Sequence, residues 1–156
     1  MAKQHDYTSL IEWTGDRGQG TKTYRGYDRT WEVRPPGKPV IACSNDPLLG
    51  GDPTLHNPED LLLSSLSACH MLWYLHLASS AGIVVRGYSD TPVGVGESTP
   101  DGAGRFLRAT LRPHIIVEPG ADLAKADVIH HEIHKVCFVA RSVNFPVDYA
   151  ATYATT

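Results

Sequence analysis

The sequence has few cysteines, little net charge and no apolar run near its N-terminus. Only three of its 156 residues are cysteines, too few for a secreted scaffold held together by disulfides. The net charge of −3 at pH 7 does not fit a groove that binds nucleic acid through basic side chains. The first residues lack the apolar stretch and small-residue cleavage site of a signal peptide. We therefore expect a cytoplasmic protein with no nucleic-acid partner.

The remaining composition is that of an ordinary globular protein. Hydrophobic residues make up 42% of the chain and charged residues 20%. The 14 glycines and 11 prolines indicate many turns, and hence a substantial strand content. At this length we expect a single domain, residues 1–156, of the mixed α+β class.

The N-terminal part of the chain predicts strands within residues 7–44. Apolar and polar residues alternate on either side of a glycine-rich stretch at 15–20, which we interpret as a hairpin turn. In the second strand Arg29 falls on the same face as Tyr27 and Trp31. A charged side chain on an apolar face needs a partner, or must reach the rim of the sheet along its aliphatic stem.

A central helix is predicted over residues 57–81. Asn57 is a good N-cap, Pro58 suits the first turn, and the acidic residues that follow favour the positive end of the helix dipole. Apolar residues then occur on every side, so we expect a helix that is buried nearly all round. A membrane span has a similar length, but the serines and histidines inside the helix favour a soluble core helix without a membrane partner.

The second half of the chain predicts strands, a helix and a last strand. Strands are expected within 83–117, with a polar loop at 94–104, and Pro113 indicates an edge or a bulge. A second helix is expected over 121–140 and a final strand over 143–153.

Two of the cysteines occupy apolar helix faces. Cys69 lies in the middle of the central helix, and Cys137 shares a stripe with Ile129 and Ile133 on the second helix. Packing of the two helices could bring the two thiols within disulfide reach. Free cysteine is also among the most buried residue types, so both could instead be small core residues. Periodicity does not separate these alternatives.

Glu59 and Arg29 are candidates for a charged pair near a thiol. Glu59 precedes Cys69 by ten residues, about 15 Å along a straight helix, so it cannot touch that sulfur directly. A carboxylate at a helix start would satisfy Arg29, and an arginine held in this way could stabilise a thiolate. The alternative is an arginine that only reaches the rim of the sheet.

Three histidines precede Cys137 on the second helix. His130 and His134 have the i, i+4 spacing of a metal-binding helix, but no Cys-x-x-Cys and no His-Glu-x-x-His motif accompanies them. We expect His130, His131 and His134 to be solvated or capping side chains, with no metal and no cofactor. A zinc-dependent hydrolase that uses His130, His134 and Cys137 is a minor hypothesis.

The specific motifs resemble those of one family. The run Asn57-Pro58-Glu59-Asp60-Leu61-Leu62 before Cys69, followed much later by a helix that ends His-Lys-Val-Cys137, resembles the OsmC/Ohr family of organic hydroperoxide reductases. Further stretches at 13–21, 69–77 and 137–147 look like a less characterised branch of that family. The resemblance covers nearly the whole chain.

The resemblance implies both a fold and an assembly. It implies an OsmC-like α+β fold in which antiparallel sheets wrap around two central helices. It also implies an intertwined homodimer with the active site at the dimer interface, which would allow Glu59 of one chain to act on a thiol of the other.

The resemblance also implies the roles of individual residues. Cys69 would be the thiolate that attacks the peroxide, leaving a sulfenic acid, and Cys137 would resolve that acid as a disulfide. Glu59 matches the family glutamate that pairs with an arginine near the thiolate, and Arg17 matches the arginine of the first hairpin turn, with Arg29 as the alternative. A dithiol, such as a lipoylated protein, would restore the thiols.

The sequence departs from the family pattern at two positions. Better-known members have proline after the second cysteine, where this chain has Phe138, and members of the branch often have arginine where this chain has Gly50. Cys43 matches no family cysteine, and we interpret it as structural.

Two functions follow from these observations. The first is a thiol peroxidase for organic hydroperoxides, with an apolar lining from Leu66, Met71, Trp73 and Phe138 that favours bulky peroxides. The second is a non-enzymatic or ligand-binding protein that keeps the fold with inert core cysteines.

Overall fold

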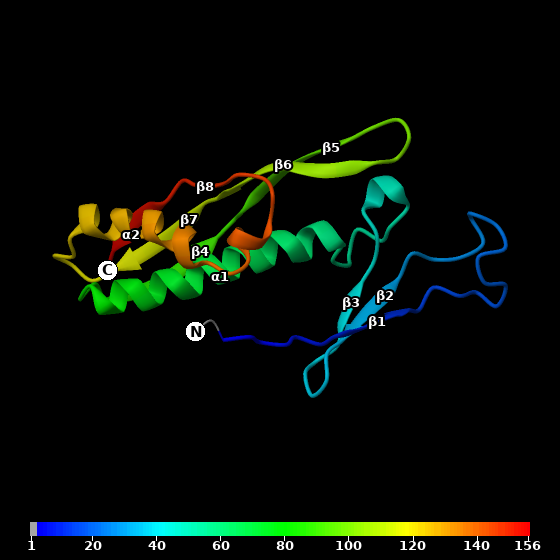
Figure 1. The fold of residues 1–156 in the computed structure, drawn as a ribbon, viewed down its shortest axis with the longest axis horizontal. Helices are drawn as coiled ribbons and strands as arrows, with labels where there is room; N and C mark the ends of the chain where they lie inside the picture. The colour runs from blue at the N-terminus through cyan, green and yellow to red at the C-terminus, as the bar shows by residue number, and fades with distance from the viewer. Residues whose placement is uncertain (1–2) are drawn as a thin grey trace. The chain divides into compact units, whose positions relative to one another are not determined.

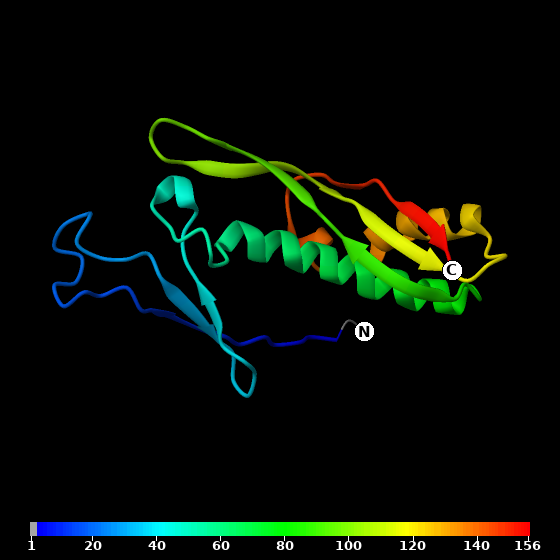
Figure 2. The same cartoon turned by 180° about the vertical axis from the view of Figure 1, so that it is seen from behind.

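The computed structural model describes residues 3–156, and the chain divides into a first unit that ends at Leu61 and a second unit, Leu62–Thr156. Figure 1 and the reverse view in Figure 2 show the elements of each unit. The long helix α1, Pro58–Ser80, begins in the first unit and continues into the second.

The first unit is built on a three-stranded antiparallel sheet with the strand order β1-β2-β3. Trp13 lies opposite Trp31, which in turn lies opposite Cys43. The predicted strands within 7–44 are present but are shorter than the alternating pattern indicates. Their bounds are Leu10–Trp13 for β1, Trp31–Arg34 for β2 and Ile41–Cys43 for β3, followed by the 3-10 helix η1 at Pro47–Leu49.

The connection between β1 and β2 is a long closed loop rather than a tight hairpin turn. The chain does not rejoin the sheet until Trp31, because Asp28 is held at the base of the loop. Its amide donates to the Gly15 carbonyl at 2.9 Å, and the Trp13 indole donates to the Asp28 carbonyl at 3.0 Å. A Cβ atom at Gly15 would lie 1.9 Å from that Asp28 oxygen. Glycine is therefore required at Gly15.

Helix α1 starts where the sequence predicts. The Asp60 amide donates to the Asn57 side chain at 2.7 Å, and the Asp60 carboxylate accepts from the Asn57 amide at 3.3 Å. This reciprocal pair satisfies two backbone amides that have no partner within the helix. Gly82 follows the helix at a φ of 76°, the left-handed conformation that often follows a helix end.

The prediction that α1 is buried nearly all round is wrong for the single chain. Its buried residues are Leu66, His70, Tyr74 and Ala78, which recur every four residues and form one stripe, whereas Leu72 is 63% exposed. By length and composition α1 is the one helix among the described residues that could cross a membrane, a test that the core helix of a soluble protein also passes.

The second unit contains two three-stranded sheets, with the orders β4-β7-β9 and β5-β6-β8. They are mixed rather than purely antiparallel, because the last two strands run parallel to their neighbours. The continuous strands expected within 83–117 are interrupted near Pro92 and Pro113, since proline cannot donate to a sheet ladder. The bounds are Val85–Asp90 for β4, Val93–Ser98 for β5, Gly104–Leu111 for β6 and Pro113–Val117 for β7.

Two further segments differ from the sequence prediction. The segment 94–104, expected as a loop, includes most of β5, in which a Cβ atom at Gly94 would lie 2.4 Å from the Phe106 ring. Gly94 thus admits the ring where a side chain would not fit. The single strand expected over 143–153 is divided into β8, Val147–Tyr149, and β9, Thr152–Thr155, one for each sheet.

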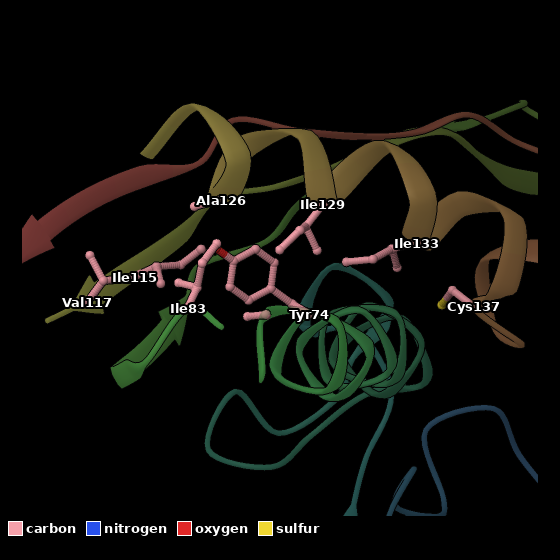
Figure 3. Packing of buried hydrophobic residues seen from close by; sticks show 9 residues of the cluster. Tyr74, Ile83, Ile115, Val117, Ala126, Ile129, Ile133 and Cys137 are labelled. Carbon is pink, nitrogen blue, oxygen red and sulfur yellow. The ribbon is translucent and has the colours of Figure 1, made fainter. Parts of the chain in front are cut away.

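Helix α2, Leu123–Val136, packs its apolar stripe on α1 and on the sheet that contains β7. Figure 3 shows Ile129 and Ile133 directed from α2 toward α1, with the Tyr74 ring between the helices and the strands. The helix ends at Val136 instead of continuing to residue 140, and the 3-10 helix η2, Ala140–Ser142, follows. A second, smaller cluster contains Leu66, Ala109, Leu111 and Val147.

Candidate active site

The two helices of the second unit bring two cysteines into contact. The sulfur atoms of Cys69 and Cys137 lie 2.9 Å apart, although 68 positions separate them in the sequence. Cys69 comes from the middle of α1, and Cys137 is the first residue after α2. The two thiols meet, and they also pack within the apolar core, because Cys137 belongs to the larger core cluster and Cys69 packs against it.

The end of α2 positions Cys137. Its amide still donates to the Ile133 carbonyl at 2.8 Å, but its φ and ψ of −66° and 110° take the chain out of the helix. The Cys137 carbonyl then accepts from the Arg141 amide at 3.1 Å. These bonds hold the backbone on both sides of the thiol. Figure 3 shows the Cys137 side chain directed toward α1.

The two thiols differ in their surroundings. Cys137 is 1% exposed, and burial, together with its hydrogen bond to Cys69, raises the pKa of its thiol. It is therefore protonated at neutral pH and donates to the Cys69 sulfur. Cys69 is partly exposed. The acceptor thus belongs to the more exposed of the two residues, and the buried Cys137 keeps its proton.

The third cysteine lies in the first unit and takes no part in this contact. Cys43 is fully buried, and its thiol contacts the Ile41 carbonyl at 3.6 Å. Burial raises the pKa of the Cys43 thiol. These features are those of a structural cysteine.

The predicted charged residues lie in the first unit. Glu59 is exposed in the first turn of α1. Both side-chain oxygens of Asp28 accept from Arg17, at 2.7 and 3.1 Å, in an ion pair in which both side chains are 53% exposed. Arg17 is thus paired with Asp28 rather than with Glu59.

Arg29 precedes β2 and is half-buried. Its guanidinium donates to the carbonyl oxygens of Tyr24 and Tyr27 at 2.8 and 3.0 Å, and it lies 4.4 and 4.6 Å from the centres of their rings. Carbonyl oxygens and aromatic rings, not the proposed carboxylate, therefore surround this charge. A Cβ atom at Gly50 would lie 3.9 Å from Arg29 Nε, so the Arg29 side chain lies beside Gly50.

The prediction that His130 is solvated is wrong. His130 is fully buried, and its Nδ1 lies 2.7 Å from Nε2 of the buried His70. Burial lowers the pKa of His70 to about 4 and that of His130 to about 3. Both rings are therefore neutral at pH 7.

Sequence reasoning missed this histidine pair, although the signal was present. His130 follows Ala126 by four residues and precedes Ile133 by three, so it shares the buried stripe of α2. His70 has the same relation to Leu66 and Tyr74 on α1. The other two histidines of the second helix, His131 and His134, are exposed as predicted.

Residues 3–156 contain no group of three or more His, Cys, Asp or Glu side chains placed to hold a metal ion. Among the side chains expected to line an apolar opening, Leu66 is 1% exposed and belongs to the smaller core cluster. Trp73 instead borders a surface hollow of about 260 Å³ with Leu72 and His76. Phe138, beside Cys137, is 62% exposed.

The structure is thus an α+β chain in which two thiols from different helices are in contact. The model of the OsmC-like protein family matches residues 51–150, and the chain belongs to this family. The resemblance seen in the sequence and the OsmC-like fold are thus confirmed.

Solved structures have the same fold. An OsmC-like protein of unknown function from Vibrio cholerae is 24% identical, with a TM-score of 0.85, and the match covers 96% of this chain and 100% of that one. Organic hydroperoxide resistance proteins from Legionella pneumophila and Elizabethkingia anophelis are 21% and 19% identical, with TM-scores of 0.68 and 0.70. The match with the Legionella protein covers 97% of this chain and 99% of that one. The match with the Elizabethkingia protein covers 100% of both chains. No curated protein matches the sequence.

Proposed function

We propose that this protein is a thiol-dependent peroxidase that reduces organic hydroperoxides to alcohols. The observation that carries the proposal is the 2.9 Å contact between a partly exposed Cys69 and a buried Cys137. Membership of the OsmC-like family supports it, as do structural neighbours that are named organic hydroperoxide resistance proteins.

In the first step the Cys69 thiolate attacks the outer oxygen of the hydroperoxide. The O–O bond breaks, an S–O bond forms, and the departing alkoxide takes a proton to become an alcohol. Sulfur is oxidised by two electrons to a sulfenic acid, and the peroxide is reduced by the same two electrons. Cys69, the more exposed residue of the pair, is the one suited to this step.

In the second step Cys137 attacks the sulfenic sulfur of Cys69. The S–O bond breaks and a disulfide forms, while the proton of the Cys137 thiol leaves with the hydroxyl group as water. A high thiol pKa keeps that proton on Cys137 until the sulfenic acid is present. An external dithiol, such as a lipoyl group, then returns two electrons and two protons and becomes a disulfide itself.

Glu59 and an arginine complete the proposed site, with the arginine stabilising the thiolate and Glu59 orienting the arginine. Arg17 matches the family arginine of the first turn, but its guanidinium is occupied by Asp28. The guanidinium of Arg29 is likewise occupied, by the carbonyl oxygens of Tyr24 and Tyr27, so these contacts select neither arginine. Replacing the contributing arginine by methionine should lower peroxidase activity about 10²-fold, so Arg17→Met and Arg29→Met measured side by side identify it.

We also propose that the protein is a homodimer. Helix α1 is apolar, yet a single stripe of it is buried in the single chain and Leu72 is 63% exposed. A second copy would cover this surface without a membrane. Analytical ultracentrifugation without detergent should give a dimer, whereas a detergent-dependent monomer would point to a lipid surface.

The test of the function compares single-cysteine variants. With cumene hydroperoxide and a dithiol, Cys69→Ser should reduce peroxide consumption to background, and Cys137→Ser should stop after one turnover. Cys43→Ala is the matched control and should keep its activity. Mass spectrometry of the non-reduced protein after one equivalent of peroxide should show a crosslink between Cys69 and Cys137.

Full activity in Cys69→Ser would end the proposal. A folded, reduced protein that leaves every organic hydroperoxide unchanged would favour the alternative, a binding protein with inert cysteines.

A further inference from the structure

A line of hydrogen bonds leads from the surface of α2 to the residue next to Cys69. The Tyr153 hydroxyl donates to Asp127 Oδ1 at 3.4 Å, and it lies 3.2 Å from His130 Nε2. His130 Nδ1 lies 2.7 Å from His70 Nε2. The line thus joins β9, α2 and α1. It ends at His70, which directly follows Cys69 in the sequence.

The carboxylate fixes the direction of every bond in this line. The Tyr153 hydroxyl is the donor to Asp127 Oδ1, so the Tyr153 proton points to Asp127. The Tyr153 oxygen then accepts from His130 Nε2–H, which leaves His130 Nδ1 without a proton. That nitrogen can only accept, and His70 must donate its Nε2–H to it.

The geometry of the two imidazoles fits a directed bond. Their planes differ by 12° and the ring centres are 5.0 Å apart, while the nearest nitrogens are 2.7 Å apart. The edges of the rings therefore meet, rather than their faces. Tyr74 and Tyr149 stack on the His130 ring at 4.6 and 4.5 Å, which restricts its rotation.

The histidine bond and the thiol contact lie between the same two helices. On α1, His70 directly follows Cys69. On α2, His130 precedes Cys137 by seven residues, which is two turns and about 10 Å of axial rise. The apolar stripe of α2 already packs on α1, and the imidazole bond adds a directed contact to this packing, about 10 Å along α2 from Cys137.

We propose that His70 and His130 are positioning residues for the thiol pair: the bond from His70 Nε2–H to His130 Nδ1 holds α1 and α2 in the register at which the Cys69 and Cys137 sulfurs meet. The register matters for turnover only if the proposed function holds, and in this respect the inference rests on that function. The contact itself can be tested without any peroxide.

Other titratable groups surround the pair and bear on its protonation. A low pKa in both rings supports the neutral, directed bond. The neighbouring groups are Tyr74 of α1, Asp90 of β4, Asp127, His131 and His134 of α2, Tyr149 of β8 and Tyr153 of β9.

The test is the equilibrium between the protein thiols and oxidised dithiothreitol. Two protein thiols give up two electrons and two protons, the protein disulfide forms, and dithiothreitol becomes the dithiol. His70→Leu removes the donor, and we expect the equilibrium constant for the Cys69–Cys137 disulfide to fall about tenfold, or about 30 mV. His70→Gln places an amide N–H where Nε2–H was, and it should restore the constant to within about twofold.

His76→Leu is the matched control, because His76 is an exposed histidine on the same helix, and it should leave the constant unchanged. A folded His70→Leu protein with the wild-type constant would overturn the proposal. Equal losses in His70→Leu and His70→Gln would also overturn it, since the hydrogen bond would then not be the cause. Inactivity toward peroxide with these shifts intact would refute the proposed function alone.

A second measurement needs no variant and covers the case in which His70→Leu does not fold. In protein labelled with ¹⁵N-histidine, NMR should show Nε2–H tautomers for both His70 and His130 at neutral pH. A proton on His130 Nδ1 would contradict the direction of the bond and with it the proposal.

Discussion

Two contacts between identical residues join α1 to α2, and they differ in their access to water. His70 and His130 are 4% and 0% exposed, and their bond continues through Tyr153 to Asp127. The thiol contact pairs a buried Cys137 with a partly exposed Cys69. The imidazole contact is thus built to persist, while the thiol contact can meet a reagent. Stability and reactivity are thus assigned to adjacent residues of α1, His70 and Cys69, whose partners are seven residues apart in the sequence.

The largest expected effect on stability is at the imidazole contact. His130→Ala should lower the free energy of unfolding by about 3–5 kcal/mol, because it opens a cavity and leaves His70 and Tyr153 without a buried partner. Urea unfolding measures the change. His134→Ala, at an exposed site on the same helix, is the control and should change it by no more than about 0.5 kcal/mol. If both variants lose a similar free energy of unfolding, the imidazole contact is not a special source of stability.

Acid should weaken the imidazole contact next. The pKa of His70 is lowered from 6.5 to about 4, so between these values the unfolded chain binds more protons than the folded one. Stability therefore falls as the pH falls through this window. His130, lowered to about 3, adds to the slope. In His70→Gln, the slope of the free energy of unfolding against pH should be smaller by about one proton across this range. Urea unfolding at several pH values measures the slope. An unchanged slope would contradict a neutral His70.

The Tyr153 hydroxyl extends the imidazole contact toward the surface. Tyr153→Phe keeps the ring but removes the acceptor for His130 Nε2–H, and the free energy of unfolding should fall by about 1 kcal/mol. Urea unfolding checks the value. Tyr24→Phe, at a residue of the first unit that is 72% exposed, is the control, because it keeps the ring that Arg29 contacts. A loss above that for His130→Ala would show that Tyr153, rather than the histidine pair, is the main stabilising residue.

The same contrast shows what the sequence could predict. Local signals placed the start of α1 near Asn57 and the apolar stripe that runs through Ile129 and Ile133 to Cys137, but they left open whether the two thiols meet. Family resemblance, not periodicity, assigned the cysteine roles. The burial of His130 was missed because histidine was taken to be a solvated residue type, although its position lies on the buried stripe. Its partner His70 is also 60 positions away in the sequence. Such a pairing depends on tertiary packing, which no local pattern encodes.

The strands were predicted less well than the helices, for a physical reason. A continuous alternation over 105–117 indicates one strand, yet the chain changes sheets at Arg112, whose amide donates to Asp90 Oδ1 at 2.6 Å. The other oxygen of Asp90 accepts from Ser67 of α1 at 2.6 Å. The break therefore depends on a side chain from another strand as well as on Pro113.

The smallest expected effect on stability is at the thiol contact, where the proposed effect on chemistry is greatest. Cys69→Ala removes the sulfur of a partly exposed residue and leaves only the weak S–H donor of Cys137 without its acceptor. The free energy of unfolding should change by less than about 1 kcal/mol, while organic peroxide consumption falls to background. Both are measured on one preparation, by urea unfolding and by a peroxide assay with a dithiol. A large loss of stability with residual activity would reverse the assignment of the two contacts, because the thiols would then hold the helices together and the catalytic group would lie elsewhere. If neither the free energy of unfolding nor the peroxide consumption changes much, the thiol contact has no role in stability or in peroxide reduction.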